Sequence, residues 1–195
     1  MTMAMLPQTN LLILLHANLM IQAKLYFDKD LPATGASIAP GIHDKGDVKF
    51  LGIVKNDTRW GIRFGNEQGQ FLTKFLFEPN ANYMNEGETP SQALQRSIDK
   101  NVGVVVRVMR TFLGEAAGNI EGEDYDSFMA NAQKEAEQFI GTPVCLKVTL
   151  KSKNDKIFSD IPDYGFIDSY VNGFPTTLYL SKKDKELFDK HSITY

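Results

Sequence analysis

Hydrophobic and polar residues alternate with a period of two along three neighbouring stretches of the chain. This period predicts strands at Val48–Lys55, Arg59–Phe64 and Gln70–Phe77. Turn-forming residues separate the stretches, at Asn56-Asp57 and at Gly65–Gly69. We therefore expect an antiparallel meander of three strands.

A helix signal follows the third strand. Thr89 suits the N-cap position, Pro90 suits the first helical position, and Gln92 completes a capping box. These residues predict a helix at about Pro90–Asn101. The next stretch, Val102–Phe112, is rich in β-branched residues and predicts a fourth strand.

Helical spacing of apolar residues returns later in the chain. It predicts a second helix at about Tyr125–Ile140, which Gly141 and Pro143 end. Alternation then predicts a strand at Val144–Leu150, with apolar residues on one face and lysines on the other. A turn-rich aromatic segment leads to a short last helix near Lys182–Lys190.

This order of elements predicts a mainly β protein with helical insertions, which belongs to the α+β class. A three-stranded meander, a helix and two further strands follow one another in the OB fold. We therefore expect an OB-like five-stranded antiparallel barrel with a helix between strands 3 and 4 and an inserted helix before the last barrel strand. An α+β sandwich without barrel closure is the alternative, because periodicity alone does not separate the two.

The 195 residues suit a single domain with an OB-like core at about residues 38–168. We expect the N-terminal region 11–27, as one or two buried strands or a helix and a strand, and the C-terminal aromatic segment 164–190 to pack on this core. The apolar run Leu11–Leu15 is far shorter than the ~20 residues that a membrane span requires. We therefore expect a soluble cytoplasmic protein with no membrane partner.

Charge is distributed unevenly along the chain, whose net charge is −3. Seven acidic residues and one lysine give the segment Gly114–Glu137 a charge of −6, so the rest of the chain carries +3. The sequence thus predicts a neutral-to-basic body with an acidic loop at Gly114–Asp124, within a loop-helix insert at 114–140. A histone-like basic protein is excluded, but binding to nucleic acid is not.

Signatures of catalysis are missing from the sequence. It contains no phosphate-binding loop, dinucleotide-binding fingerprint, nucleophile elbow or zinc-protease motif. Cys145 is the only cysteine, which excludes an intramolecular disulfide and a cysteine-based zinc site. The three histidines lie far apart in the sequence. We therefore expect a protein that is not an enzyme and that uses no cofactor or metal.

Cationic and aromatic residues on the predicted strands suggest a binding surface. Arg59 and Arg63 share one face of the second strand, and Trp60 and Phe64 share the other. Proteins that bind single-stranded nucleic acid combine cations for the phosphates with flat rings on which bases stack. The candidate cations are Arg59, Arg63, Lys74, Arg107, Lys147 and Lys151, and the candidate stacking rings are Trp60, Phe64, Phe71 and Phe75.

Scattered blocks of the sequence resemble a known family. The run Ala39–His43, followed by Val48–Val54, is similar to the start of the core domain in phage-encoded single-stranded DNA-binding proteins. Further similar blocks lie at Phe64–Phe71, Phe75–Pro79, Gly141–Val148 and Pro162–Asp168. The resemblance implies an OB-type barrel, sequence-nonspecific binding to single-stranded DNA, and a role in viral DNA replication or recombination in the host cytoplasm. It also implies replication or recombination proteins as further partners.

Two other functions stay open at this point. A structural or assembly protein of a virion or scaffold would use the same strand face for contact with another protein. A metal-dependent nuclease that uses Glu121, Glu123 and Asp124 is the less favoured of the two, because acidic residues at the start of a helix also stabilise its dipole. The sequence leaves the oligomeric state and the choice between DNA and RNA open.

Overall fold

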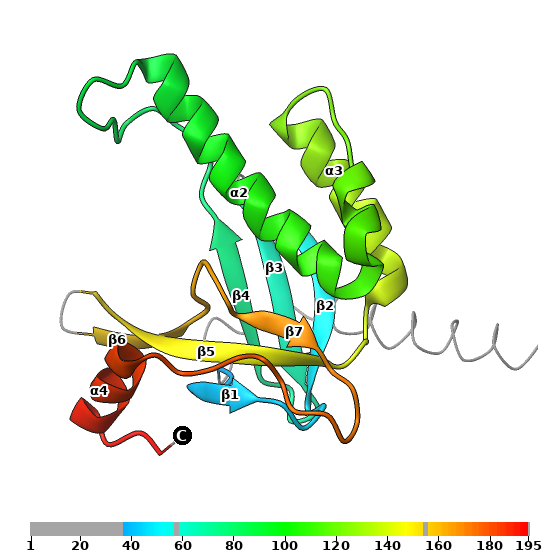
Figure 1. Cartoon of the computed structure of the whole chain (residues 1–195), viewed down its shortest axis with the longest axis vertical. Coiled ribbons are helices and arrows are strands. Elements are labelled where there is room, and N and C mark those ends of the chain that lie inside the picture. The colour runs from blue at the N-terminus through cyan, green and yellow to red at the C-terminus, as the bar shows by residue number, and fades with distance from the viewer. Residues whose placement is uncertain (1–36, 57–58, 154–155, 195) are drawn as a thin grey trace, which may run out of the picture. The chain divides into compact units, whose positions relative to one another are not determined.

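Two antiparallel sheets and three α-helices make up the part of the chain that the structure describes (Figure 1). This computed structural model describes residues 37–56, 59–153 and 156–194. All of them belong to one of the two units into which the chain divides, residues 36–195. The predicted elements in the region 11–27 lie outside the described residues.

The predicted meander is confirmed as one sheet. Its strands are β2 (Val48–Asn56), β3 (Arg59–Asn66) and β4 (Phe71–Leu76), paired antiparallel in that order. Alternation buries one face of β3, where Phe64 is fully enclosed and pairs across the sheet with Leu72 of β4.

The second sheet forms around β5 (Val144–Lys153), which includes the predicted strand. Strand β1 (Gly41–His43) pairs with β5, and so do β6 (Lys156–Asp160) and β7 (Ile167–Ser169). The two sheets meet where β2 approaches the start of β5: the Phe50 amide donates to the Thr142 carbonyl over 2.9 Å, and the Gly141 amide donates to the Phe50 carbonyl over 2.8 Å.

A long helix, α2 (Pro90–Leu113), replaces both the predicted helix and the predicted fourth strand. The capping box of Thr89 and Gln92 is confirmed, but the strand at Val102–Phe112 is wrong. Val105 and Val108 are both buried against the core at helical spacing. Burial of a valine side chain contributes about 1.5 kcal/mol or more. Its helix propensity costs at most about 0.7 kcal/mol relative to alanine, so packing decides the conformation.

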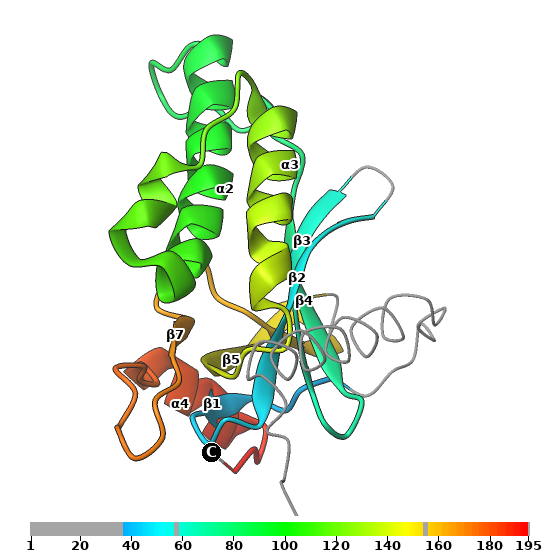
Figure 2. The same ribbon diagram turned by 90° about the vertical axis from the view of Figure 1, so that its right-hand side faces the viewer.

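The second predicted helix is observed as α3 (Tyr125–Ala136), which a short 3₁₀ turn at Glu137–Phe139 extends. Helices α2 and α3 lie side by side, joined by a 3₁₀ turn at Gly114–Asn119 and an irregular stretch (Figures 1 and 2). Both belong to the single connection between β4 and β5. The predicted position of α3 between two barrel strands is therefore wrong, because the expected fourth strand, Val102–Phe112, is part of α2.

The β-rich α+β class is confirmed. Within the described ranges no hydrogen-bonded ladder joins β4 to β6, so these strands form two sheets and not a closed barrel. The core lies between the sheets and the two neighbouring helices, and includes Phe50, Ile62, Met109 and Met129.

The last predicted helix is confirmed as α4 (Lys182–Lys190), which Ser181 caps. It packs against β5, and its Phe188 is fully buried. The part of this face of β5 around Lys147 is therefore covered by protein and not by solvent. Among the described helices, none combines the length and apolar character that a bilayer crossing requires.

Candidate functional site

Two arginines and three phenylalanines gather on the outer face of β3 and β4. Residues two apart on a strand share a face. The register pairs Arg63 with Thr73 and Gly61 with Phe75, so the odd-numbered residues of both strands point the same way. We call this surface the cation–aromatic face; its members are Arg59, Arg63, Phe71, Phe75 and Phe77.

Each arginine of the cation–aromatic face lies over a ring. The guanidinium of Arg59 is 5.6 Å from the ring centre of Phe77, and that of Arg63 is 5.9 Å from the ring centre of Phe71. The Nε of Arg63 also donates to the hydroxyl of Thr73 over 3.4 Å. These contacts hold both cations against the sheet.

The rings and charges of this face remain available to a ligand. Phe75 is 46% exposed and Phe77 is 64% exposed. Burial lowers the pKa of Arg63, but a guanidinium still keeps its charge at neutral pH. Neither Arg59 nor Arg63 forms an ion pair with any carboxylate in the described part of the chain. No carboxylate of residues 37–56, 59–153 or 156–194 therefore compensates their positive charge.

Glycine at position 61 lets Phe75 lie close to β3. A Cβ atom there would come within 2.7 Å of the Thr73 Cγ2 and 3.5 Å of the Phe75 Cδ1. The first distance is too short for two carbon atoms, so a larger residue would displace the side chains of β4. The small residue thus contributes to the flat surface beside the exposed ring.

Two of the four predicted stacking rings lie in the core instead. Trp60 is only 5% exposed, and its Nε1 donates to a carboxylate oxygen of Asp126 over 3.0 Å. Lys55 binds the same oxygen over 3.2 Å, and the hydrogen bonds from Trp60 and then Lys55 lower the pKa of Asp126. Phe64 is fully buried beside Phe50. Neither Trp60 nor Phe64 has a face open to a base.

Lys74 points to the interior as well. Its side chain is 7% exposed, and its Nζ donates to the Ile161 carbonyl over 2.7 Å and to the Asp163 carboxylate over 2.8 Å. Lys100 binds the other oxygen of Asp163 over 2.8 Å. Partial burial alone would raise the pKa of Asp163, but the hydrogen bonds from Lys100 and Lys74 outweigh it and hold that pKa at about 2.

The remaining predicted cations lie on other elements. Arg107 is on α2, where its Nη1 donates to the Asp163 carbonyl over 2.7 Å. Lys147 is buried under α4 and forms an ion pair with Asp184 over 2.7 Å. Lys151 is largely exposed on β5. The six predicted cations therefore do not share one strand face. Lys74 and Arg107 both contact Asp163, and Lys147 is enclosed under α4. Arg59 and Arg63 share the outer face of β3 and β4 with Phe71 and Phe75.

Sequence reasoning missed Phe77 as a site residue, although it continues the alternation of Phe71 and Phe75. The alternation itself indicated this residue, because Phe77 lies two positions after Phe75 and therefore on the same face of the strand. No pattern in the sequence connects Phe77 with Lys100 or Tyr164, because these residues come together only when the chain folds.

Side chains that could bind a metal ion do not cluster in the described part of the chain. No group of three or more His, Cys, Asp or Glu side chains there could hold a metal ion. Asp124 caps α3 by accepting a hydrogen bond from the Ser127 amide over 2.7 Å, and its hydrogen bonds with Ser127 lower its pKa. Burial raises the pKa of the Cys145 thiol, which disfavours the reactive thiolate.

Comparisons with known proteins give no match: no family model, no curated protein and no solved structure matches this chain. The function must therefore be inferred from the residues and their geometry.

Proposed function

We propose that this protein binds single-stranded DNA without sequence preference, through the cation–aromatic face of β3 and β4. The observation that carries the proposal is a pair of arginines that each lie over a phenylalanine ring and have no carboxylate partner among the described residues. Guanidinium groups bind phosphates strongly, and exposed rings stack on any base because every base has a π face. Stacking of this kind does not depend on which base is present.

The order of the strands supports this proposal. Strands β2, β3 and β4 follow one another, β2 approaches β5, and Lys74 of β4 reaches the Ile161 carbonyl just beyond β6. We propose that these strands follow the circuit of an OB barrel that is open between β4 and β6. In OB folds the face of the second and third strands binds oligonucleotides, and in this proposal β3 and β4 are those strands.

The biological role that fits this activity is the protection of single strands during viral DNA replication or recombination. No catalytic step is involved, and replication or recombination proteins are the partners that this role implies. The role rests on the sequence resemblance, whereas the binding activity rests on the geometry of β3 and β4.

An assembly role for the same face is the second candidate. Exposed Phe75 and Phe77 would also suit contact with another protein, since clustered apolar rings mark interaction sites. The two functions differ in their dependence on salt. Binding to phosphates weakens steeply as salt rises, whereas apolar association does not.

The binding of fluorescently labelled oligo-dT at several salt concentrations tests the proposal. Each phosphate contact on a single strand adds about 0.7 to the slope of log affinity against log salt. Replacing both Arg59 and Arg63 by Gln should therefore reduce that slope by about 1.4 and weaken binding. Lys182→Gln on α4 is the matched control, because this lysine is almost fully exposed.

Lys147, another of the predicted cations, is not substituted, because the loss of its nearly enclosed ion pair with Asp184 would destabilise the fold. If the double variant stays folded and binds oligo-dT as tightly as the wild type, the proposed face is wrong. Salt-insensitive self-association with no affinity for oligo-dT would favour the assembly role instead.

A further inference from the structure

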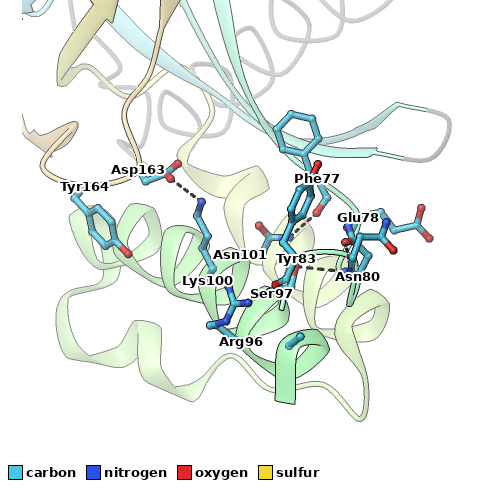
Figure 3. A pocket seen from close by; sticks show the side chains of 12 residues that line it. Phe77, Glu78, Asn80, Tyr83, Arg96, Ser97, Lys100, Asn101, Asp163 and Tyr164 are labelled. Carbon is cyan, nitrogen blue, oxygen red and sulfur yellow. Dashed lines mark hydrogen bonds and ion pairs between the residues drawn. The ribbon is translucent and has the colours of Figure 1, made fainter. Parts of the chain in front are cut away.

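A pocket of about 840 Å³ opens where the loop after β4 meets α2 and the segment Asp163–Tyr164 (Figure 3). Its volume falls within the range of about 300–1,000 Å³ that is typical of small-ligand sites. Figure 3 shows Phe77 and Tyr83 toward one side and Tyr164 toward the other, with Lys100 between them in this view. All three rings are largely exposed.

Hydrogen bonds hold the walls of this pocket in place. Arg96 of α2 binds both carboxylate oxygens of Glu88, over 2.8 and 2.9 Å, and also donates to the Tyr83 carbonyl. The hydrogen bond from Arg96 is the main cause that lowers the pKa of Glu88 to about 2. Asn101 donates to the Phe77 carbonyl over 2.7 Å. The loop between β4 and α2 is thus fixed to the helix near both of its ends.

Cations outnumber carboxylates around Asp163. Lys74 and Lys100 both bind its carboxylate over 2.8 Å, and Arg107 donates to its backbone carbonyl while lying over the Tyr164 ring at 4.8 Å. Lys74 is buried, whereas Lys100 is 56% exposed on the pocket wall. A phosphate can therefore bind the ammonium group of Lys100 while Asp163 keeps its ion pair with Lys74. Glu78 is the other acidic residue that lines the pocket.

The pocket continues the cation–aromatic face. Phe77 lines the pocket and also lies beneath the guanidinium of Arg59. We propose that a single strand leaves the face of β3 and β4 at Phe77 and places its next nucleotide in this pocket. Its phosphate binds Lys100, and its base lies against the ring of Tyr83. This inference rests on the proposed function and adds a second binding subsite to it.

The test is a series of oligo-dT probes from about four to about twelve nucleotides, within the span of site sizes known for OB folds. A short probe fills only the sheet face, so Lys100→Gln should leave its affinity unchanged. For the longest probe, the same variant should weaken binding about tenfold or more, because it removes a charged hydrogen bond to phosphate. The salt slope should fall by about 0.7 for that probe alone.

Tyr83→Leu tests the base contact separately, because it removes the aromatic ring and leaves an apolar side chain. It should also weaken only the longer probes. Lys182→Gln, the control on α4, should change no probe. Circular dichroism and thermal unfolding of each variant check that the fold is kept.

The outcomes separate this inference from the proposed function. If Lys100→Gln and Tyr83→Leu bind every probe as the wild type does, while the Arg59 and Arg63 double variant loses binding, the pocket is not a subsite and the proposed function stands. If the variants of the pocket weaken short and long probes equally, the length-dependent path is wrong. If the wild type binds no probe, both proposals fail.

Discussion

Lys74 shows how one residue can follow the alternation of a strand and still require a specific partner. It shares the inward face of β4 with Leu76, and its ammonium group is enclosed. An unpaired buried charge costs several kcal/mol, so such a lysine needs compensation. The Ile161 carbonyl and the Asp163 carboxylate provide it. Asp163 therefore joins the end of β6 to β4 and, through Lys100, to α2.

Removing the charge of Asp163 should destabilise the fold. We expect Asp163→Asn to lower the free energy of unfolding by about 1–3 kcal/mol, less than for a fully buried pair because this carboxylate is partly exposed. Glu186→Gln breaks an exposed pair with Lys182 and should cost less than about 1 kcal/mol. Urea unfolding of the two variants gives the comparison. Equal stability would show that Lys74 does not depend on Asp163.

Acid should destabilise the fold by protonating the carboxylate of Asp163. The pKa of Asp163 is about 2 in the folded chain, below its usual value of 3.8. Its stabilisation is therefore complete above about pH 4 and is lost as the pH falls toward 2. After allowance for solvent screening, the contribution is on the order of 1 kcal/mol.

Urea midpoints measured between about pH 5 and about pH 2 test this pH dependence. Glu88 titrates in the same interval, so the difference between the wild type and Asp163→Asn isolates the contribution of Asp163. The variant should lose less stability on acidification than the wild type. Parallel curves for the two proteins would contradict the assignment.

At the scale of elements, local signals determined some parts of the fold and tertiary contacts determined others. The capping box at Thr89 and the alternation in β3 are local, and both were predicted from the sequence. The conformation of Val102–Phe112 was not, because β-branched residues favour strands until a helix face is packed against a core. Alternation likewise places Lys147 opposite the core, but it does not reveal that α4 covers that face.

Gly103 provides a test of the helix in the segment once predicted as a strand. It lies inside α2, and a Cβ atom there would meet no atom within 4 Å. Alanine is a better helix former, so Gly103→Ala should raise the free energy of unfolding by about 0.5–1 kcal/mol.

Gly87 is the matched control for this substitution. It also has free space around it, but its φ of +77° lies in the left-handed region. Gly87→Ala should therefore destabilise the protein by about 1 kcal/mol. Chemical unfolding of both variants provides the measurement, and destabilisation by Gly103→Ala would contradict a regular helix at that position.

At the scale of the whole described unit, charge and exposure single out one face. Lys55, Lys74 and Lys147 each pair with a carboxylate, whereas Arg59 and Arg63 do not pair with one in the described part of the chain. The sequence predicted that cations and rings would combine, but it could not tell which of them neighbouring elements would enclose. In the described part of the chain, the outer face of β3 and β4 keeps both kinds of residue available, and the pocket beside it adds Lys100 and Tyr83.

A tryptophan placed on that face tests the central claim most directly. The chain contains a single tryptophan, Trp60, which is buried beside Asp126. In a Phe75→Trp variant, oligo-dT should quench the fluorescence of the added indole, and high salt should reverse the quenching, because bases stack on exposed rings that phosphate contacts bring near. The wild-type signal from Trp60 should change little. Binding of oligo-dT with no response at position 75, or with quenching of Trp60 alone, would contradict the account.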